Sequence, residues 1–179
     1  MATVPTTHTV TGTVATTSEM NSFFRDPINF LLNKPAAQVY SAAVQSIPNT
    51  TATALTFDTE RFDTDPDAVG GHSTSVNTSR YTARYPGWYH VSGRYTYVAN
   101  ATGFRAVSIA VNGTGMPETL AFGSTPTGAL TQHVATDGDV FLNVGDYVEL
   151  LAQQTSGGAL NTDTGNGAFP RMTVEWVRN

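Results

Sequence analysis

The chain has 179 residues, a formal net charge of −5 and no cysteine. Its 9 lysines and arginines form no cluster in the sequence, which argues against the basic surface of a nucleic-acid-binding protein. The lack of cysteine excludes disulfides, zinc–thiolate sites and thiol nucleophiles. Only 13% of the residues are charged, against about a quarter in ordinary soluble domains, so we expect copies of the chain or other proteins to cover much of the surface.

The amino-terminal residues do not match the pattern of a targeting signal. Residues 1–10 are rich in threonine and lack the basic and apolar segments of a secretion leader. No apolar run approaches the length of a membrane span. We therefore expect a protein that is made in a cytoplasm and is not inserted into a membrane.

Residues 1–35 are predicted to form an N-terminal arm, first extended and then helical. Residues 16–19 match a capping box and Asp26-Pro27 suits a helix start, so 18–34 should form one kinked helix or two short ones, ending at Lys34-Pro35. A segment this small cannot bury its many large apolar side chains against itself. They are Met20, Phe23, Phe24, Ile28, Phe30, Leu31 and Leu32.

Two interpretations of these apolar side chains stay open. The arm packs under the following domain as an extra core layer, or it docks into a larger assembly or around the arms of symmetry-related copies. We favour docking and assign the seven residues to that contact.

Residues 36–179 are predicted to form one all-β domain. Apolar and polar residues alternate with period two, in short segments separated by Pro, Gly, Asn and Asp. About ten short strands in a chain of this size favour a double-sheet jelly-roll sandwich. The expected strands are 39–44, 54–57, 79–85, 88–98, 104–111, 118–122, 129–134, 139–142, 147–154 and 171–177.

The most hydrophobic of these strands begins at Tyr147, after a turn at Gly145 and Asp146. It is apolar on both faces, whereas a strand of a half-solvated sheet alternates, so we expect both faces to be covered. One face would contact the core, and we expect a partner subunit to bury the other face. The residues predicted at this subunit interface are Tyr147, Glu149, Leu150 and Leu151.

Three segments carry a combination of motifs. They are the Gly-x-Tyr motif within 85–91, the strand 104–111 running into Asn112-Gly113, and the Leu-x-x-Gly-Asp-x-Val-x-Leu motif of 142–150. The combination resembles the complement globular-head and tumour-necrosis-factor family of jelly rolls, over about residues 36–178. Gly93 departs from the family, which more often has an aromatic residue there, and the last strand fits loosely. The resemblance implies a compact homotrimer that binds or is displayed and does not catalyse a reaction.

The arm carries a second likeness. Glu19-Met20-Asn21, Phe24-Arg25-Asp26 and residues 29–32 before a proline resemble the start of many small structural proteins of tailed bacteriophages. Together the two resemblances imply a virion protein on the tail tip, a fibre or the capsid surface. Its arm would bind other virion proteins, and its trimer would contact a host-surface glycan or stabilise the particle. The alternative is a free-standing trimeric, lectin-like module that binds carbohydrate or protein.

The densest charges lie between residues 58 and 67. Three of them, Asp63, Asp65 and Asp67, imitate the opening of a calcium loop. Ala68 stands where the turn glycine belongs and Thr74 where the bidentate glutamate belongs, which excludes a helix–loop–helix site. A looser calcium site between subunits stays open, but we favour a solvated loop paired with Arg61 and Arg80. No cofactor is expected.

No catalytic residues are predicted. The four histidines are scattered singly, and no serine or aspartate stands in a nucleophile motif. The loops 123–129 and 155–168, rich in Gly, Thr and Asn, are the expected places for contact with a ligand.

Overall fold

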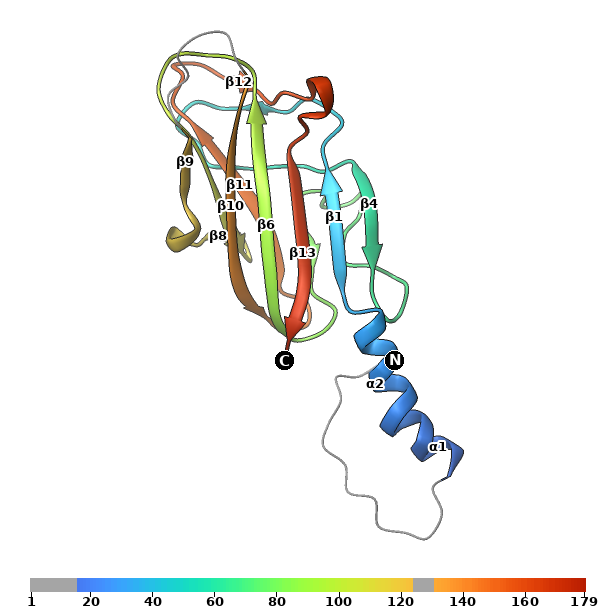
Figure 1. The fold of residues 1–179 in the computed structure, drawn as a ribbon. Helices are drawn as coiled ribbons and strands as arrows, with labels where there is room; N and C mark the ends of the chain where they lie inside the picture. Colours follow the sequence, from blue (N-terminus) through green and yellow to red (C-terminus); the bar gives the residue numbers. More distant parts are fainter. Residues whose placement is uncertain (1–15, 124–130) are drawn as a thin grey trace.

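The computed structural model describes residues 16–123 and 131–179. The extended start of the arm and most of the loop 123–129 lie outside the described residues. The described chain forms a β-sandwich with a helical arm at one end (Figure 1). The all-β jelly-roll class predicted from the sequence is confirmed.

The first sheet has five strands in the order β10–β6–β13–β1–β4, and all neighbours are antiparallel. In β6, alternate residues are large and apolar, so one face of the strand is fully buried against the second sheet. The strands are β1 (Ala36–Tyr40), β4 (Thr59–Thr64), β6 (Gly87–Tyr97), β10 (Gln132–Leu142) and β13 (Arg171–Arg178).

The second sheet follows the order β3–β11–β7–β8, with β5 added beside β11 and β9 beside β7. A separate two-stranded ribbon, β2 with β12, lies at the end opposite the arm (Figure 1). The strands are β2 (Ser46–Ile47), β3 (Thr53–Ala54), β5 (Tyr81–Thr82), β7 (Arg105–Val111), β8 (Thr114–Gly115), β9 (Ala121–Gly123), β11 (Tyr147–Gln154) and β12 (Leu160–Asn161). Two 3₁₀-helices are η2 (Pro117–Thr119) and η3 (Gly165–Gly167).

Several elements differ from the sequence prediction. The expected strands 129–134 and 139–142 belong to the single strand β10, and the expected strands 39–44 and 79–85 correspond to the shorter β1 and β5. The expected strand 118–122 starts only at Ala121, because Pro117 has no N–H for a ladder and begins η2 instead. Strand β4 was not expected, because Glu60, Arg61 and Asp63 break its apolar alternation. It is the outer strand of its sheet, where charged side chains hinder unwanted pairing with other chains.

The departure at Gly93 has a packing cause. A Cβ atom at this position would lie 2.1 Å from Leu150 Cδ1 and 2.9 Å from the carbonyl oxygen of Arg171. Leu150 of the opposite sheet fills the space that a side chain on β6 would occupy. An aromatic residue at this position is therefore incompatible with Leu150.

The arm contains one helix rather than two. α1 (Thr17–Met20), a π-helical turn η1 (Asn21–Arg25) and α2 (Asp26–Leu32) follow one another without a break. The capping box is present, since the Glu19 N–H donates to Thr16 Oγ1 and the Thr16 N–H donates to the Glu19 carboxylate. Pro27 lacks an N–H and would clash with a carbonyl one turn earlier in an α-helix, and the wider π turn relieves that clash.

Phe30 joins the arm to the sandwich. Its side chain is fully buried, with its ring 4.9 Å from that of Trp176 and 5.3 Å from that of Tyr85, both edge-on. This corrects the assignment of Phe30 to docking, because the residue belongs to the core of its own domain. The division at residue 35 therefore cuts through a packed contact.

We expect Phe30→Ala to lower the free energy of unfolding by about 3–5 kcal/mol, since the substitution opens a cavity between two aromatic rings. The matched control is Ile28→Ala, two residues earlier on an exposed position, which should change it by less than about 0.5 kcal/mol. Urea denaturation measures both. Equal effects of the two substitutions would show that the arm is not anchored through Phe30.

Candidate functional site

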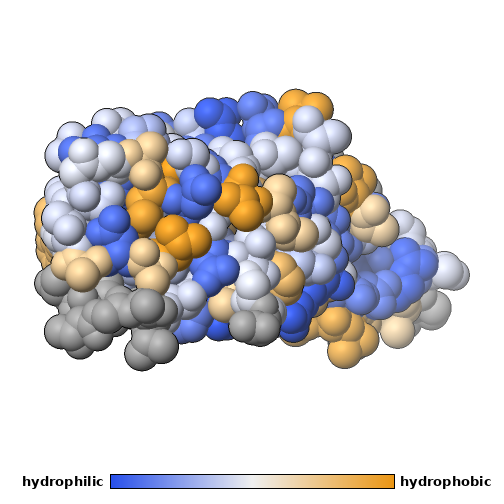
Figure 2. Space-filling model, turned by 90° about the horizontal axis from the view of Figure 1, so that it is seen from above, coloured by the Kyte–Doolittle hydropathy of each residue, from blue (hydrophilic) through white to orange (hydrophobic). Residues whose placement is uncertain are grey.

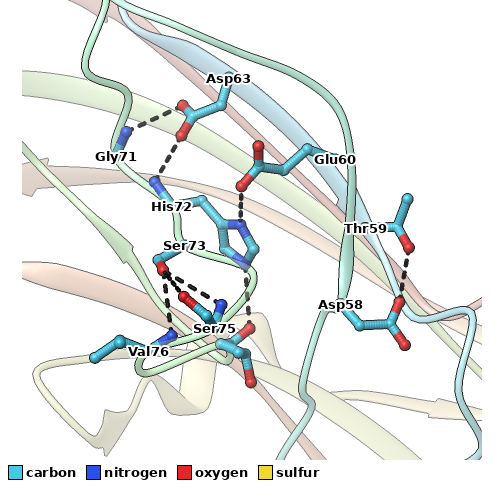
Figure 3. Close-up of polar contacts among 10 residues, drawn as sticks. Asp58, Thr59, Glu60, Asp63, Gly71, His72, Ser73, Ser75 and Val76 are labelled. Carbon is cyan, nitrogen blue, oxygen red and sulfur yellow. Dashed lines mark hydrogen bonds and ion pairs between the residues drawn. The ribbon is translucent and has the colours of Figure 1, made fainter.

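Asp63, one of the calcium candidates, binds the backbone of its own loop. It accepts N–H bonds from Gly71 at 3.0 Å and His72 at 2.8 Å (Figure 3). Burial raises the pKa of Asp63, although these two N–H groups oppose the shift. The buried His72 ring places Nδ1 2.8 Å from Glu60 Oε1 and Nε2 3.2 Å from the Thr78 carbonyl oxygen. Both partners accept, so the two bonds form together only when both ring nitrogens carry protons.

Asp65 is held in the same way, and Arg84 reaches both Asp65 and Asp67. Asp65 accepts N–H bonds from Asp67 at 2.9 Å and Val69 at 3.1 Å. Its buried carboxylate also lies 2.8 Å from Arg84 Nε, at ion-pair distance but without hydrogen-bond alignment. A second Arg84 nitrogen lies 3.4 Å from Asp67. Within residues 16–123 and 131–179, no three His, Cys, Asp or Glu side chains are grouped to hold a metal ion.

The partners predicted for this acidic loop were wrong. Arg84, rather than Arg61 or Arg80, pairs with its carboxylates. Arg80 instead pairs with Glu149 of β11, and Arg61 lies over the Tyr40 ring. The loop borders a partly open pocket of about 220 Å³, lined by residues between 69 and 82.

The residues predicted at the subunit interface are largely covered by their own chain. Leu150 is fully buried in the sandwich, and Glu149 accepts bonds from Ser79 Oγ at 2.6 Å and Arg80 Nε at 3.2 Å. The Arg80 guanidinium lies 4.0 Å from the centre of the Tyr147 ring. The inference that a partner must cover this strand is therefore corrected for Leu150 and Glu149, while Tyr147 and Leu151 keep partial exposure.

The arm exposes most of the side chains assigned to docking. Five of them are between 47% and 74% exposed, namely Met20, Phe24, Ile28, Leu31 and Leu32, while Phe23 is partly buried. In a regular α-helix, residues four apart drift by about 40° around the axis. The π turn is wider and reduces this drift, so that Met20, Phe24 and Ile28 form one stripe along the arm. We call these five exposed residues the arm stripe.

The outward face of the five-stranded sheet carries a second group of exposed aromatic residues. Trp88 of β6 and Phe141 of β10 meet edge-on with ring centres 5.8 Å apart, and Phe62 of β4 is also exposed. Tyr40 of β1 packs against Phe169, with ring centres 5.1 Å apart. The sequence did not single out this face, because its aromatic residues come from distant segments. Seen from above, by contrast, apolar residues form small separate groups among hydrophilic ones (Figure 2).

The described histidines lie apart from one another. His72 belongs to the acidic loop, His90 Nδ1 lies 2.8 Å from the exposed Asp139, and His133 Nδ1 lies 2.9 Å from Thr96 Oγ1. In the described part of the chain, no histidine joins both a carboxylate and a hydroxyl nucleophile. The expectation that the protein is not an enzyme stays a prediction. No described helix is long and apolar enough to cross a bilayer.

Solved structures with a similar fold come from two groups of proteins. The globular domain of zebrafish complement 1qA has a TM-score of 0.55 and 14% identity, covering 82% of this chain and 100% of that one. Eiger TNF from S. frugiperda has a TM-score of 0.54 and 13% identity, and the match covers 82% of this chain and 96% of that one. Murine APRIL has a TM-score of 0.53 and 13% identity, and the match covers 78% of this chain and 97% of that one.

These identities establish a fold only. The chain is a jelly roll similar to the complement globular head and to tumour necrosis factor, as the motifs of 85–91 and 142–150 predicted. Comparison with protein-family models and with curated proteins finds no match.

We expect removal of calcium with EDTA to leave the melting temperature unchanged, because backbone N–H groups and Arg84 already hold the loop carboxylates. A metal bound only to the folded chain would stabilise it by mass action. Differential scanning calorimetry with and without EDTA makes the test. A lower melting temperature in EDTA, restored by added calcium, would show that the folded protein binds calcium and would contradict this expectation.

Proposed function

We propose that the protein is a structural component of a bacteriophage particle, in which a homotrimeric jelly roll is displayed and the arm attaches it to other virion proteins. The observation that carries this proposal is the arm stripe, a line of exposed apolar side chains on a helix that leaves the sandwich at its base (Figure 1). Large exposed apolar surfaces of this kind mark interaction sites.

The geometry of the arm suits attachment. Phe30 fixes the last turn of the helix in the core, so the stripe is presented from a packed base rather than from a loose tail. Burying one such side chain contributes roughly 1.5–3 kcal/mol. Three arms on one trimer would act together, which raises the total strength far above that of a single arm.

The two ends of the molecule support display. The helix lies at one end of the sandwich, and the β12 end, with the loop 155–168, lies at the other (Figure 1). A subunit anchored through the arm would point that loop outward, where it can meet a host-surface glycan. A tail tip, a fibre and a capsid surface all fit this orientation.

The outward face of the five-stranded sheet is the surface that supports a trimer. Its exposed Phe62, Trp88 and Phe141 belong to residue types that are enriched at interfaces. In β7 of the other sheet, the outward positions are Ala106 and Ala110, already fully buried within the subunit, and the small Ser108. We therefore assign the main subunit contact to the five-stranded sheet.

Light scattering of the purified chain is expected to give three times 19.0 kDa, since the exposed aromatic residues of the sheet need a cover. The measurement should be made at micromolar concentration. A stable monomer there would contradict the trimer and, with it, cooperative attachment through three arms.

Charges placed in the arm stripe should abolish incorporation into particles. Phe24→Asp with Ile28→Asp puts two unpaired carboxylates into the buried contact, which costs several kcal/mol. The matched control is Ser22→Asp with Asn29→Asp, at exposed polar positions of the same helix. Both variants should keep the melting temperature of the wild type, because Phe30 is untouched. Incorporation measured by immunoblot of purified particles should fall to background for the first pair alone, and equal incorporation of both pairs would contradict docking through the stripe.

The second candidate function is a free-standing trimeric module that binds carbohydrate or protein. The observation that favours it is the pocket beside the acidic loop, where Ser73, Asn77 and Arg80 present polar groups. Two results together would favour this function over attachment. The trimer would bind a soluble glycan saturably, and charges in the arm stripe would leave incorporation into particles unchanged.

A further inference from the structure

Three arginines gather in one row across the outward face of the five-stranded sheet. Arg94 of β6 is the direct cross-strand partner of Arg171 of β13, and Arg171 is the partner of Tyr40 on β1. Arg61 of β4 lies over the same tyrosine, with its guanidinium carbon 5.8 Å from the ring centre. Four neighbouring strands thus carry the three arginines and Tyr40 at neighbouring positions. We call Arg61, Arg94 and Arg171 the arginine row.

No carboxylate of residues 16–123 and 131–179 pairs with the arginine row, whereas Arg25, Lys34, Arg80 and Arg84 all form ion pairs with carboxylates. Like charges directly opposite each other on adjacent strands destabilise a sheet. Burial, followed by the charges of Arg171 and Arg61, lowers the pKa of Arg94. The repulsion is therefore present within the isolated subunit.

One of the three arginines has a further structural contact. Arg94 donates from Nε to the Phe169 carbonyl at 3.1 Å and from a terminal nitrogen to the Gly167 carbonyl at 3.3 Å. These bonds hold the turn before β13 but supply no negative charge. Arg61 and Arg171 have no such carbonyl partners in the described chain, so their guanidinium groups are available to an anion.

The β10 edge of the same sheet, beside the strand that carries Arg94, is acidic. β10 is its outer strand, and Asp137 and Asp139 project from the outward side of that strand. Glu118 belongs to the 3₁₀-helix that adjoins the inward side of this edge strand, since the hydroxyl of the buried Thr136 donates to the carbonyl of Thr119. Asp137 and Glu118 are exposed and form no ion pair in the described residues, while Asp139 pairs with His90. We call Glu118, Asp137 and Asp139 the acidic edge.

We propose that the arginine row of one subunit binds the acidic edge of the next copy in the homotrimer. The inference rests on the trimer proposed above and names the surfaces that form it. Each subunit offers one arginine row and one acidic edge, so every contact joins two different surfaces and repeats in the same direction around a ring. Such a contact pairs the unpartnered arginines with Asp137 and Glu118 of a neighbour. The exposed Phe62 and Trp88 on the same face supply apolar contacts around these charges.

Charge exchange between the two surfaces tests the pairing. The first variant carries Arg61→Glu and Arg171→Glu, which spares the Arg94 contacts to the turn. The second carries Glu118→Arg and Asp137→Arg, and the third combines all four changes. In sedimentation velocity at one concentration and low salt, the first two should be monomeric because each brings like charges together. The third should recover the trimer.

Two controls separate the pairing from other effects. Arg25→Glu with Lys34→Glu makes the same change in net charge at exposed positions away from the row, and it should remain trimeric. Arg61→Gln with Arg171→Gln removes the charges without reversing them and is least disruptive to folding. It should raise the dissociation constant at least about tenfold and weaken its dependence on salt.

The outcomes distinguish this inference from the trimer itself. A wild-type monomer overturns both. A wild-type trimer that persists in the first two variants overturns the arginine–acidic-edge contact and leaves the trimer standing. Failure of the combined variant to reassemble, with a wild-type melting curve, also overturns the pairing. If a reversed variant fails to fold, an unchanged dissociation constant of the glutamine variant still contradicts it.

Discussion

The close approach of Leu150 to Gly93 fixes how the two sheets pack. Leu150 occupies the place where β6 would carry a side chain, so the centre of the sandwich closes around an aliphatic group rather than an aromatic one. The tyrosines of β6 before and after this point, Tyr89 and Tyr95, then fill the core on either side. A larger residue at position 93 would push the sheets apart and disturb the registry of β6 with β13 and β10.

The sequence predicted the sandwich because its local signals agree with the fold. The capping box at Thr16 and Glu19 and the turn at Gly145 and Asp146 depend on neighbouring residues, which a single sequence displays directly. The strand β4 escaped prediction for the opposite reason. Its place at the sheet edge, rather than its own hydrophobicity, determines its structure, and that place depends on pairing with β1.

The surfaces were harder to predict because they join distant parts of the chain. Arg94 and Arg171 are unremarkable in the sequence and become direct neighbours only through the pairing of β6 with β13. Phe30 shows the converse case. Its apolar character was clear, but whether it met solvent or the core depended on Trp176 and Tyr85, which arrive from other segments. Alternation along a strand likewise could not show that Arg80 would cover Glu149.

The π-helical turn of the arm also restricts how the protein can change during evolution. Loss of one residue within this turn, between Asn21 and Arg25, would restore a regular α-helix, and the flanking residues would keep nearly their present orientation because a π turn holds one residue more than an α-helical turn. Loss of one residue between Asp26 and Asn29 would instead rotate everything before the deletion by about 100° relative to Phe30. Met20 and Phe24 would then point to a different side from their present one, even though every apolar residue type was retained. Lineages that share this attachment should therefore confine changes in the length of the helix to the π turn.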